Sequence, residues 1–186
     1  MRLVAPSDTR AMPWKSGGGT TWEVAIHPPG ADWSSFGWRV SIAEVASDGP
    51  FSTFSGIDRT LVVLAGRGMR LTGAGDAPVD LAPYDAIAFA GEAHVEGTLL
   101  DGPTRDLNVM VRRGSWRSDV RVVRDARAAM PPATTYVCHA ALQSARCMAD
   151  AVEVEVPEGH TLVTEASRFS VDAAHGAVAI VAMVTA

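Results

Sequence analysis

The sequence has few cysteines and no long apolar segment. Cys138 and Cys147 are its only cysteines, nine residues apart, a spacing that matches neither a CxxC redox pair nor a zinc knuckle. A disulfide framework is therefore excluded, and we expect two reduced thiols in the core. The first residues lack the apolar stretch of roughly 7 to 15 residues that export needs. The apolar run at residues 177–184 is shorter than the ~18 residues of a membrane span. The sequence predicts a cytoplasmic protein with no membrane partner.

Several sequence motifs of common enzymes are also missing. There is no Gly-x-Ser-x-Gly nucleophile elbow and no glycine-rich phosphate loop ending in Lys-Ser or Lys-Thr, which speaks against an ordinary hydrolase or kinase. The 21 acidic residues outnumber the 16 basic ones, and the arginines are scattered along the chain. Nucleic acid is therefore not expected as a partner.

Short apolar or alternating segments separated by Gly/Pro turns predict an all-β protein built from antiparallel barrels or sandwiches. Helical periodicity is confined to residues 140–149, where Ala141, Leu142, Ala145 and Met148 share a face, with a weaker case at residues 125–130. The strand-sized segments are residues 38–45, 60–64, 69–71, 86–89, 107–111, 120–123, 135–137, 152–156, 162–164 and 177–184.

A polar, Arg-rich stretch suggests how the chain is divided. It ends in Pro131 and Pro132, and its composition is typical of a linker. We expect an N-terminal lobe at residues 1–115, a linker at 116–132 and a C-terminal lobe at 133–186, joined in one compact unit.

Six segments of the N-terminal part together resemble the HutD/Ves family, and the resemblance spans residues 2 to about 122. It implies a bicupin, two small antiparallel β-barrels of the jelly-roll type with little helix, and an association with bacterial histidine utilisation. The family usually has Asn where this chain has Ser16, and Phe where it has Leu107. The segments are MPWKSGGGT (12–20), WRVSIAEV (38–45), DGPFSTFSGIDR (48–59), LAPYDAIAFAG (81–91), LDGP (100–103) and RDLNVM (105–110).

Metal-dependent cupins hold their ion with a His-x-His pair, a carboxylate and a further histidine, and this chain has no His-x-His. His94 is the one candidate ligand, because it follows a turn where cupins often place one. The alternative is a solvent-facing turn residue. We expect no metal, no cofactor and no catalytic residue of the usual kinds.

Other residues point to carboxylate binding. Gly17, Gly18 and Gly19 can expose consecutive backbone N–H groups to an anion, beside the charge of Lys15, or can form a tight turn into a strand. Period-two geometry puts Arg39 and Ser41 on one strand face, and Asp106 and Asn108 on one face of another. The candidate ligand-binding residues are Trp14, Lys15, Gly17, Gly18, Gly19, Thr20, Arg39, Ser41, Arg59 and Asn108.

Two further candidates, Arg59 and Trp14, also have structural alternatives. Arg59 can bind a carboxylate through two parallel N–H···O bonds, or it can form a salt bridge with Asp58 or Asp106. Trp14 can line such a pocket together with Trp38, or both rings can simply pack in the core.

Two functions follow. The first is a non-catalytic binder of a small carboxylate with a regulatory role in histidine utilisation; the family association suggests urocanate or a formyl- or formimino-glutamate. The second is a cupin-fold enzyme, an isomerase or hydrolase acting on a small organic acid, with Glu44 or Asp106 as general base. The sequence leaves monomer and homodimer open.

Overall fold

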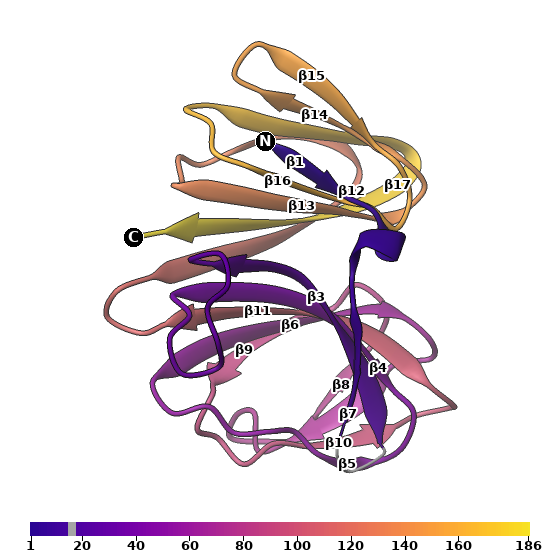
Figure 1. Cartoon of the computed structure of the whole chain (residues 1–186). Coiled ribbons are helices and arrows are strands. Elements are labelled where there is room, and N and C mark those ends of the chain that lie inside the picture. Colours follow the sequence, from indigo (N-terminus) through magenta and orange to yellow (C-terminus); the bar gives the residue numbers. More distant parts are fainter. Residues whose placement is uncertain (15–17) are drawn as a thin grey trace. The chain divides into compact units, whose positions relative to one another are not determined.

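The chain is an all-β protein, as the sequence predicts. The computed structural model (Figure 1) describes residues 1–14 and 18–186, and its one helical element there is the short 3-10 turn η1 (Pro6–Asp8). Its contacts divide the chain into two compact units. We call residues 10–115 the N-terminal barrel, and residues 1–9 with 116–186 the C-terminal barrel.

The N-terminal barrel consists of two antiparallel sheets. In the larger sheet the strands follow the order β2 (Ala11–Pro13), β3 (Gly19–His27), β4 (Trp38–Val45), β11 (Thr104–Arg112), β6 (Ile57–Ala65) and β9 (Ala86–Ala90). In the smaller sheet they follow the order β5 (Gly49–Pro50), β10 (Glu96–Leu99), β7 (Met69–Thr72) and β8 (Val79–Leu81).

Both sheets contribute to the apolar core of this barrel. Leu61 and Val63 of β6 cluster with Met69 and Leu71 of β7, and all four are fully buried. Alternation along β7 is strict, with Met69 and Leu71 buried and the residues after each exposed, as expected for a strand with one face in the core and the other in water.

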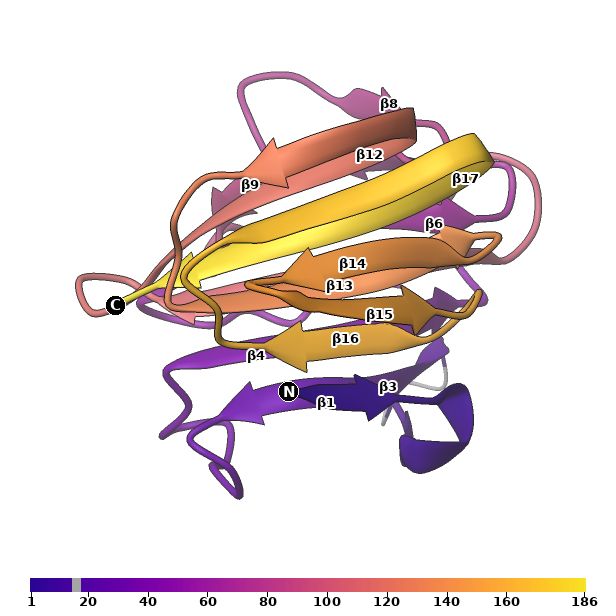
Figure 2. The same ribbon diagram turned by 90° about the horizontal axis from the view of Figure 1, so that it is seen from above.

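The C-terminal barrel is built around one long strand. In its sheet the order is β1 (Arg2–Val4), β16 (Thr161–Thr164), β13 (Thr135–Leu142), β17 (Phe169–Thr185), β14 (Ala145–Ala149) and β15 (Val152–Val156), and β12 (Arg117–Met130) also pairs with β17. Figure 2 shows β12 and β17 side by side, and their pairing runs from Arg117 opposite Thr185 to Met130 opposite Phe169.

The expected linker at residues 116–132 is wrong, because β12 occupies most of it. Only residues 120–123 of this segment have a strand-like apolar pattern, because most of the β12 side chains are exposed and the strand extends the sheet beyond β17. The expected lobe boundary at residue 1 is also wrong, since β1 pairs with β16 and so belongs to the C-terminal barrel.

The helix expected at residues 140–149 is likewise absent. Its residues form the end of β13, a turn at Gln143 with φ of 55°, and β14. In β14 the buried residues are Ala145, Cys147 and Ala149, a period of two that overrides the helical spacing. The weaker helical segment, residues 125–130, belongs to β12.

Across residues 1–14 and 18–186, no helix is long and apolar enough to cross a membrane.

Candidate functional site

Polar residues gather on the inner face of the larger sheet of the N-terminal barrel, where apolar ones are expected. Ser41 of β4 lies opposite Asn108 of β11, and Arg39 lies opposite Met110. The period-two interpretation of these two strands is therefore confirmed: Arg39, Ser41 and Asn108 share one face. All three side chains are buried, so the barrel encloses a polar cluster.

Arg39 is held by two polar contacts and an aromatic ring. Its Nε donates to Glu23 Oε2 at 2.8 Å and its Nη1 donates to Ser41 Oγ at 2.9 Å. Its guanidinium carbon lies 4.4 Å from the centroid of the Trp33 ring, within the range of cation–π attraction. The buried Nη2 has no hydrogen-bond partner among the described residues.

Arg59 of β6 contacts neutral acceptors. Its Nε and Nη2 both donate to Asn108 Oδ1 at 3.2 Å, and its Nη1 donates to the Ser52 carbonyl oxygen at 3.0 Å. The rings of Phe51, Phe54 and Phe89 lie 4.9–5.7 Å from its guanidinium carbon. Arg59 therefore carries a buried positive charge among aromatic rings and neutral oxygens.

Asp106 completes the cluster from the same face of β11. Its Oδ1 accepts a hydrogen bond from Asn108 Nδ2 at 3.2 Å, whereas its buried Oδ2 has no hydrogen-bond partner in residues 1–14 and 18–186. Asp106 is fully buried. It therefore interacts with Arg59 through the bridging Asn108 amide and through charge.

Burial shifts the protonation of these groups. It raises the pKa of the Asp106 carboxyl to about 7, against the opposing effects of the Asn108 hydrogen bond and the Arg59 charge. Burial also lowers the pKa of Arg59 to about 10 and lowers the pKa of Arg39. Near neutral pH both guanidiniums are charged, while Asp106 is divided between its two forms.

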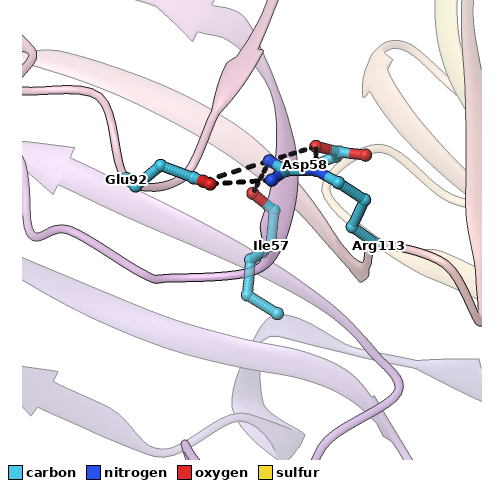
Figure 3. Close-up of polar contacts among 4 residues, drawn as sticks. All are labelled: Ile57, Asp58, Glu92 and Arg113. Carbon is cyan, nitrogen blue, oxygen red and sulfur yellow. Dashed lines mark hydrogen bonds and ion pairs between the residues drawn. The ribbon is translucent and has the colours of Figure 1, made fainter.

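Among the described residues, Arg59 has no hydrogen-bonded salt bridge with Asp58 or Asp106, the two partners considered from the sequence. Asp58 instead accepts a hydrogen bond from Arg113 Nε at 2.7 Å, and Glu92 accepts from Arg113 Nη1 and Nη2 at 2.7 and 3.0 Å (Figure 3). Arg113 Nη2 also donates to the Ile57 carbonyl oxygen at 3.3 Å. Arg113 thus ties together the start of β6 and the turn after β9.

The glycine-rich segment is only partly described, since Lys15 and Gly17 lie outside the described residues. Gly18 accepts a backbone hydrogen bond from Ala46, and Gly19 accepts one from Trp14. A Cβ on Gly19 would overlap the Glu44 carbonyl oxygen and press on the Trp14 ring. The absence of a Cβ at Gly19 therefore allows the backbone to lie close to the Glu44 carbonyl oxygen and the Trp14 ring.

The remaining aromatic and hydroxyl candidates divide between the two faces of the sheet. Trp14 packs against the core and its Nε1 donates to Thr21 Oγ1 at 2.7 Å. Thr20 lies opposite Glu44, on the other face from Arg39. Trp38 is buried on that other face as well and stacks on His27 with ring centroids 5.7 Å apart. Thr20 and Trp38 are therefore not part of the cluster.

Two residues considered for chemistry lie in exposed positions. His94 is exposed, in agreement with its interpretation as a turn residue. Glu44 is also exposed and lies on the face opposite to Asp106, so of the two candidate bases only Asp106 faces the cluster. Among the described residues no group of three His, Cys, Asp or Glu side chains is placed to hold a metal ion.

Sequence reasoning missed several residues of the cluster. Glu23 lies in β3, a strand that the apolar pattern did not indicate, because most of its residues are only partly buried. Trp33 lies in a loop and approaches Arg39 through tertiary contact alone. Phe51, Phe54 and Phe89 stand within the family-like segments, so their aromatic spacing was the available signal.

Fold and cluster together make this chain a cupin-like β-barrel protein. The HutD family model matches residues 6–181, and the chain belongs to the HutD family. A 21.2 kDa protein of Pseudomonas putida, described as uncharacterized and lying in the hutC 3' region, is 42% identical over 118 residues, covering 63% of this chain and 62% of the relative. Protein Ves of Citrobacter koseri is 38% identical over 119 residues, 62% of this chain and 61% of Ves. The chain thus spans about three fifths of the length of the curated relatives it matches.

Solved structures extend the similarity to the whole chain. A conserved protein of unknown function from Pseudomonas aeruginosa PAO1, PA5104, superposes with a TM-score of 0.91 at 30% identity, covering 100% of this chain and 98% of that one. HutD from Pseudomonas fluorescens SBW25 gives 0.83 at 28% identity, covering 99% and 97%. A cupin 2 conserved barrel domain protein from Leptotrichia buccalis gives 0.56 at 9% identity, covering 94% and 91%, and supports the fold alone.

Proposed function

We propose that the protein binds a small carboxylate inside the N-terminal barrel, without catalysis, and acts as a regulatory sensor in histidine utilisation. The observation that carries the proposal is Arg59, a buried guanidinium whose hydrogen-bond acceptors in the described residues are neutral. A buried charge without a counter-ion is costly. A ligand carboxylate would supply that counter-ion.

The charge balance of the cluster supports an anion. Glu23 offsets Arg39, with which it is hydrogen-bonded at 2.8 Å. Asp106 is the only other carboxylate that we assign to the cluster, and near neutral pH it is partly protonated, because burial raises its pKa to about 7. The cluster thus retains part of a positive charge, and an incoming carboxylate would neutralise it.

The identity of the carboxylate rests on the relatives alone. One relative lies in a hutC 3' region, and the P. fluorescens HutD structure is described as that of a formate condition. The histidine-utilisation link is the reason for proposing urocanate, N-formylglutamate or formiminoglutamate as candidates. A cytoplasmic location is part of the same proposal. A sedimentation measurement with and without the acid would distinguish a monomer from a homodimer.

A second function, an enzyme acting on a small organic acid, is favoured by one observation. Asp106 has a pKa of about 7 and a buried oxygen without a partner in the described residues, which is what a general acid or base requires. Consumption of a bound acid that stops in Asp106→Asn would favour the enzyme over the binder.

Thermal unfolding of chelator-treated protein tests the binding proposal. A specific ligand stabilises the folded state by RT ln(1 + [L]/Kd). We expect one or more of urocanate, N-formylglutamate and formiminoglutamate to raise the melting temperature, and the matching methyl esters to have no effect. The exposed variant Arg67→Gln should respond like the wild type. If no acid shifts the transition, the proposed function is wrong.

A further inference from the structure

Two buried polar atoms of the cluster stand out because the described residues leave them without a hydrogen-bond partner: Arg39 Nη2 and Asp106 Oδ2. Buried polar groups in folded proteins are almost always hydrogen-bonded. While Asp106 is ionised the two atoms have opposite roles, since a guanidinium N–H only donates and an ionised carboxylate oxygen only accepts. A ligand that satisfies both must therefore carry an acceptor and a donor.

The strand register shows that these atoms face the same interior. Three successive rows on the inner face are Arg39 opposite Met110, Ser41 opposite Asn108 and Ala43 opposite Asp106. Arg39 Nη1 donates to Ser41 Oγ at 2.9 Å, so its guanidinium reaches into the middle row. Asn108, in that same middle row, contacts Asp106 at 3.2 Å.

The spacing limits the size of such a ligand. Alternate residues on one strand face are about 6.6 Å apart, so the middle row, which the Arg39 guanidinium reaches through Ser41, is about that far along the sheet from the row of Asp106. Two hydrogen bonds of about 2.9 Å each leave room for only a few covalent bonds between the ligand's acceptor and its donor. Arg59 lies beside the middle row, hydrogen-bonded to Asn108.

We infer that the barrel holds a two-ended site, in which Arg39 and Arg59 take the carboxylate of a small acid and Asp106 Oδ2 accepts a hydrogen bond from an N–H group close to that carboxylate. The inference rests on the proposed function and narrows it. The ligand class is a small acid with an N–H donor near its carboxylate, and a plain aliphatic acid fills only half of the site.

A matched pair of acids tests the donor end. N-acetylglycine and 4-oxopentanoate have the same shape, but a CH₂ in the second replaces the N–H of the first. Calorimetric titrations at about pH 8.5 keep Asp106 ionised and Arg59 charged. With the wild type we expect N-acetylglycine to bind roughly tenfold or more tightly than 4-oxopentanoate, the usual effect of a hydrogen bond to a charged group.

The variant Asp106→Asn reverses the polarity at the donor end and keeps the volume. Its amide oxygen can take the hydrogen bond from Asn108, which puts an N–H group where Oδ2 stood, so the preference for N-acetylglycine should disappear. Asp106→Leu removes the acceptor altogether and should abolish the preference too. The readout is the ratio of two affinities in one protein, so a general loss of affinity does not imitate the result.

Acetate, which carries the shared carboxylate alone, separates the two proposals. If acetate binds but N-acetylglycine has no advantage, or keeps its advantage in both Asp106 variants, the two-ended site is wrong and the proposed function stands. If acetate, both larger acids and the three candidate acids of the proposed function all fail to bind the wild type, the proposed function itself is wrong.

Discussion

Asn108 Oδ1 accepts hydrogen bonds from both Nε and Nη2 of Arg59, each at 3.2 Å. The amide therefore occupies one of the two edges of the guanidinium, Nε with Nη2, on which a carboxylate can form two parallel bonds. The remaining nitrogen of the guanidinium, Nη1, donates a hydrogen bond to the Ser52 carbonyl oxygen at 3.0 Å. A bound acid must displace one of these neutral acceptors or share the guanidinium with it, and it gains a charged contact in return.

Replacing Arg59 separates binding from folding. If Arg59 contacts the ligand carboxylate, Arg59→Ala should weaken acetate binding by about 1.5–3 kcal/mol, the range for hydrogen bonds to charged groups. Arg59→Lys should recover only part of the affinity, because an ammonium lacks the planar fork. Calorimetric titration and denaturant unfolding of the same variants provide the two measurements.

The exposed pair of Arg67 and Asp101 offers the matched control. Arg67 is 77% exposed, so Arg67→Ala changes the net charge equally and should leave acetate affinity unaltered. Unchanged affinity in Arg59→Ala, together with a lower unfolding midpoint, would show that Arg59 is purely structural.

The two cysteines should be reduced and unreactive in the folded protein. Cys147 Sγ and Cys138 Sγ are 3.5 Å apart and both are fully buried, whereas a disulfide needs about 2.05 Å. The hydrogen bond from Cys147, with burial, raises the pKa of the Cys138 thiol, and a thiol without thiolate reacts slowly. A disulfide-exchange reagent should label neither cysteine in native protein and both in concentrated guanidinium chloride. Rapid labelling of the native protein would contradict this.

Two strand segments that the sequence predicted correctly are buried along almost their whole length. Residues 38–45 and 177–184 alternate or run apolar because their side chains are buried. Only residues 120–123 of the strand β12 were predicted, because its other side chains are mostly exposed and its pairing with β17 left no longer apolar pattern. The Ala-rich spacing of residues 140–149 fits either period, and only the partner strands of β14 decided it.

For the cluster, local periodicity identified partners within strands but not between segments. It put Arg39 with Ser41 and Asp106 with Asn108, since residues two apart share a face. It could not place Trp33 over Arg39, because a loop residue is positioned by tertiary packing and has no period. Nor could it show that Asp106 reaches Arg59 through an amide, because that depends on the register of β11 against β6.

Burial of Asp106 should appear in the pH dependence of stability. Its pKa is about 7 in the folded protein, against an ordinary value of 3.8. Between pH 3.8 and about pH 7 the folded state therefore binds more protons than the unfolded state. Stability from this group is therefore full below about pH 4 and is lost as the pH rises through 7. Asn108 donates a hydrogen bond to the carboxyl and Arg59 acts on it through its charge, while Ala43 and Val63 are the cross-strand neighbours of Asp106.

The variant Asp106→Asn isolates this effect, because the amide does not titrate. Denaturant unfolding between about pH 4.5 and pH 7.5 should show the wild type losing stability relative to Asp106→Asn as the pH rises. Surface carboxylates such as Glu92, whose pKa the Arg113 hydrogen bonds lower to about 2, act below this window. A constant difference between the two proteins would mean that Asp106 is ionised throughout.

The Arg113 contacts of Figure 3 predict a local rather than a global effect. Arg113 is exposed, so its ion pairs with Asp58 and Glu92 contribute little to overall stability. They fasten the start of β6 to the turn after β9. The segment just before β6, which carries Ser52 and Phe54, meets the same turn, because the Phe54 N–H donates to the Gly91 carbonyl oxygen at 2.7 Å. In Arg113→Gln we expect faster hydrogen exchange at the amides of Phe54 and Gly91, with the unfolding midpoint nearly unchanged.

Arg70 provides the comparison for this test. It makes an equally short exposed ion pair with Asp80, with bonds of 2.6 and 2.8 Å, between β7 and β8 of the smaller sheet. Arg70→Gln should leave exchange at Phe54 and Gly91 as in the wild type, because its pair lies on other strands. If the two amides exchange equally in wild type, Arg113→Gln and Arg70→Gln, the ion pairs of Arg113 do not stabilise the segment beside Arg59, and the predicted local effect is wrong.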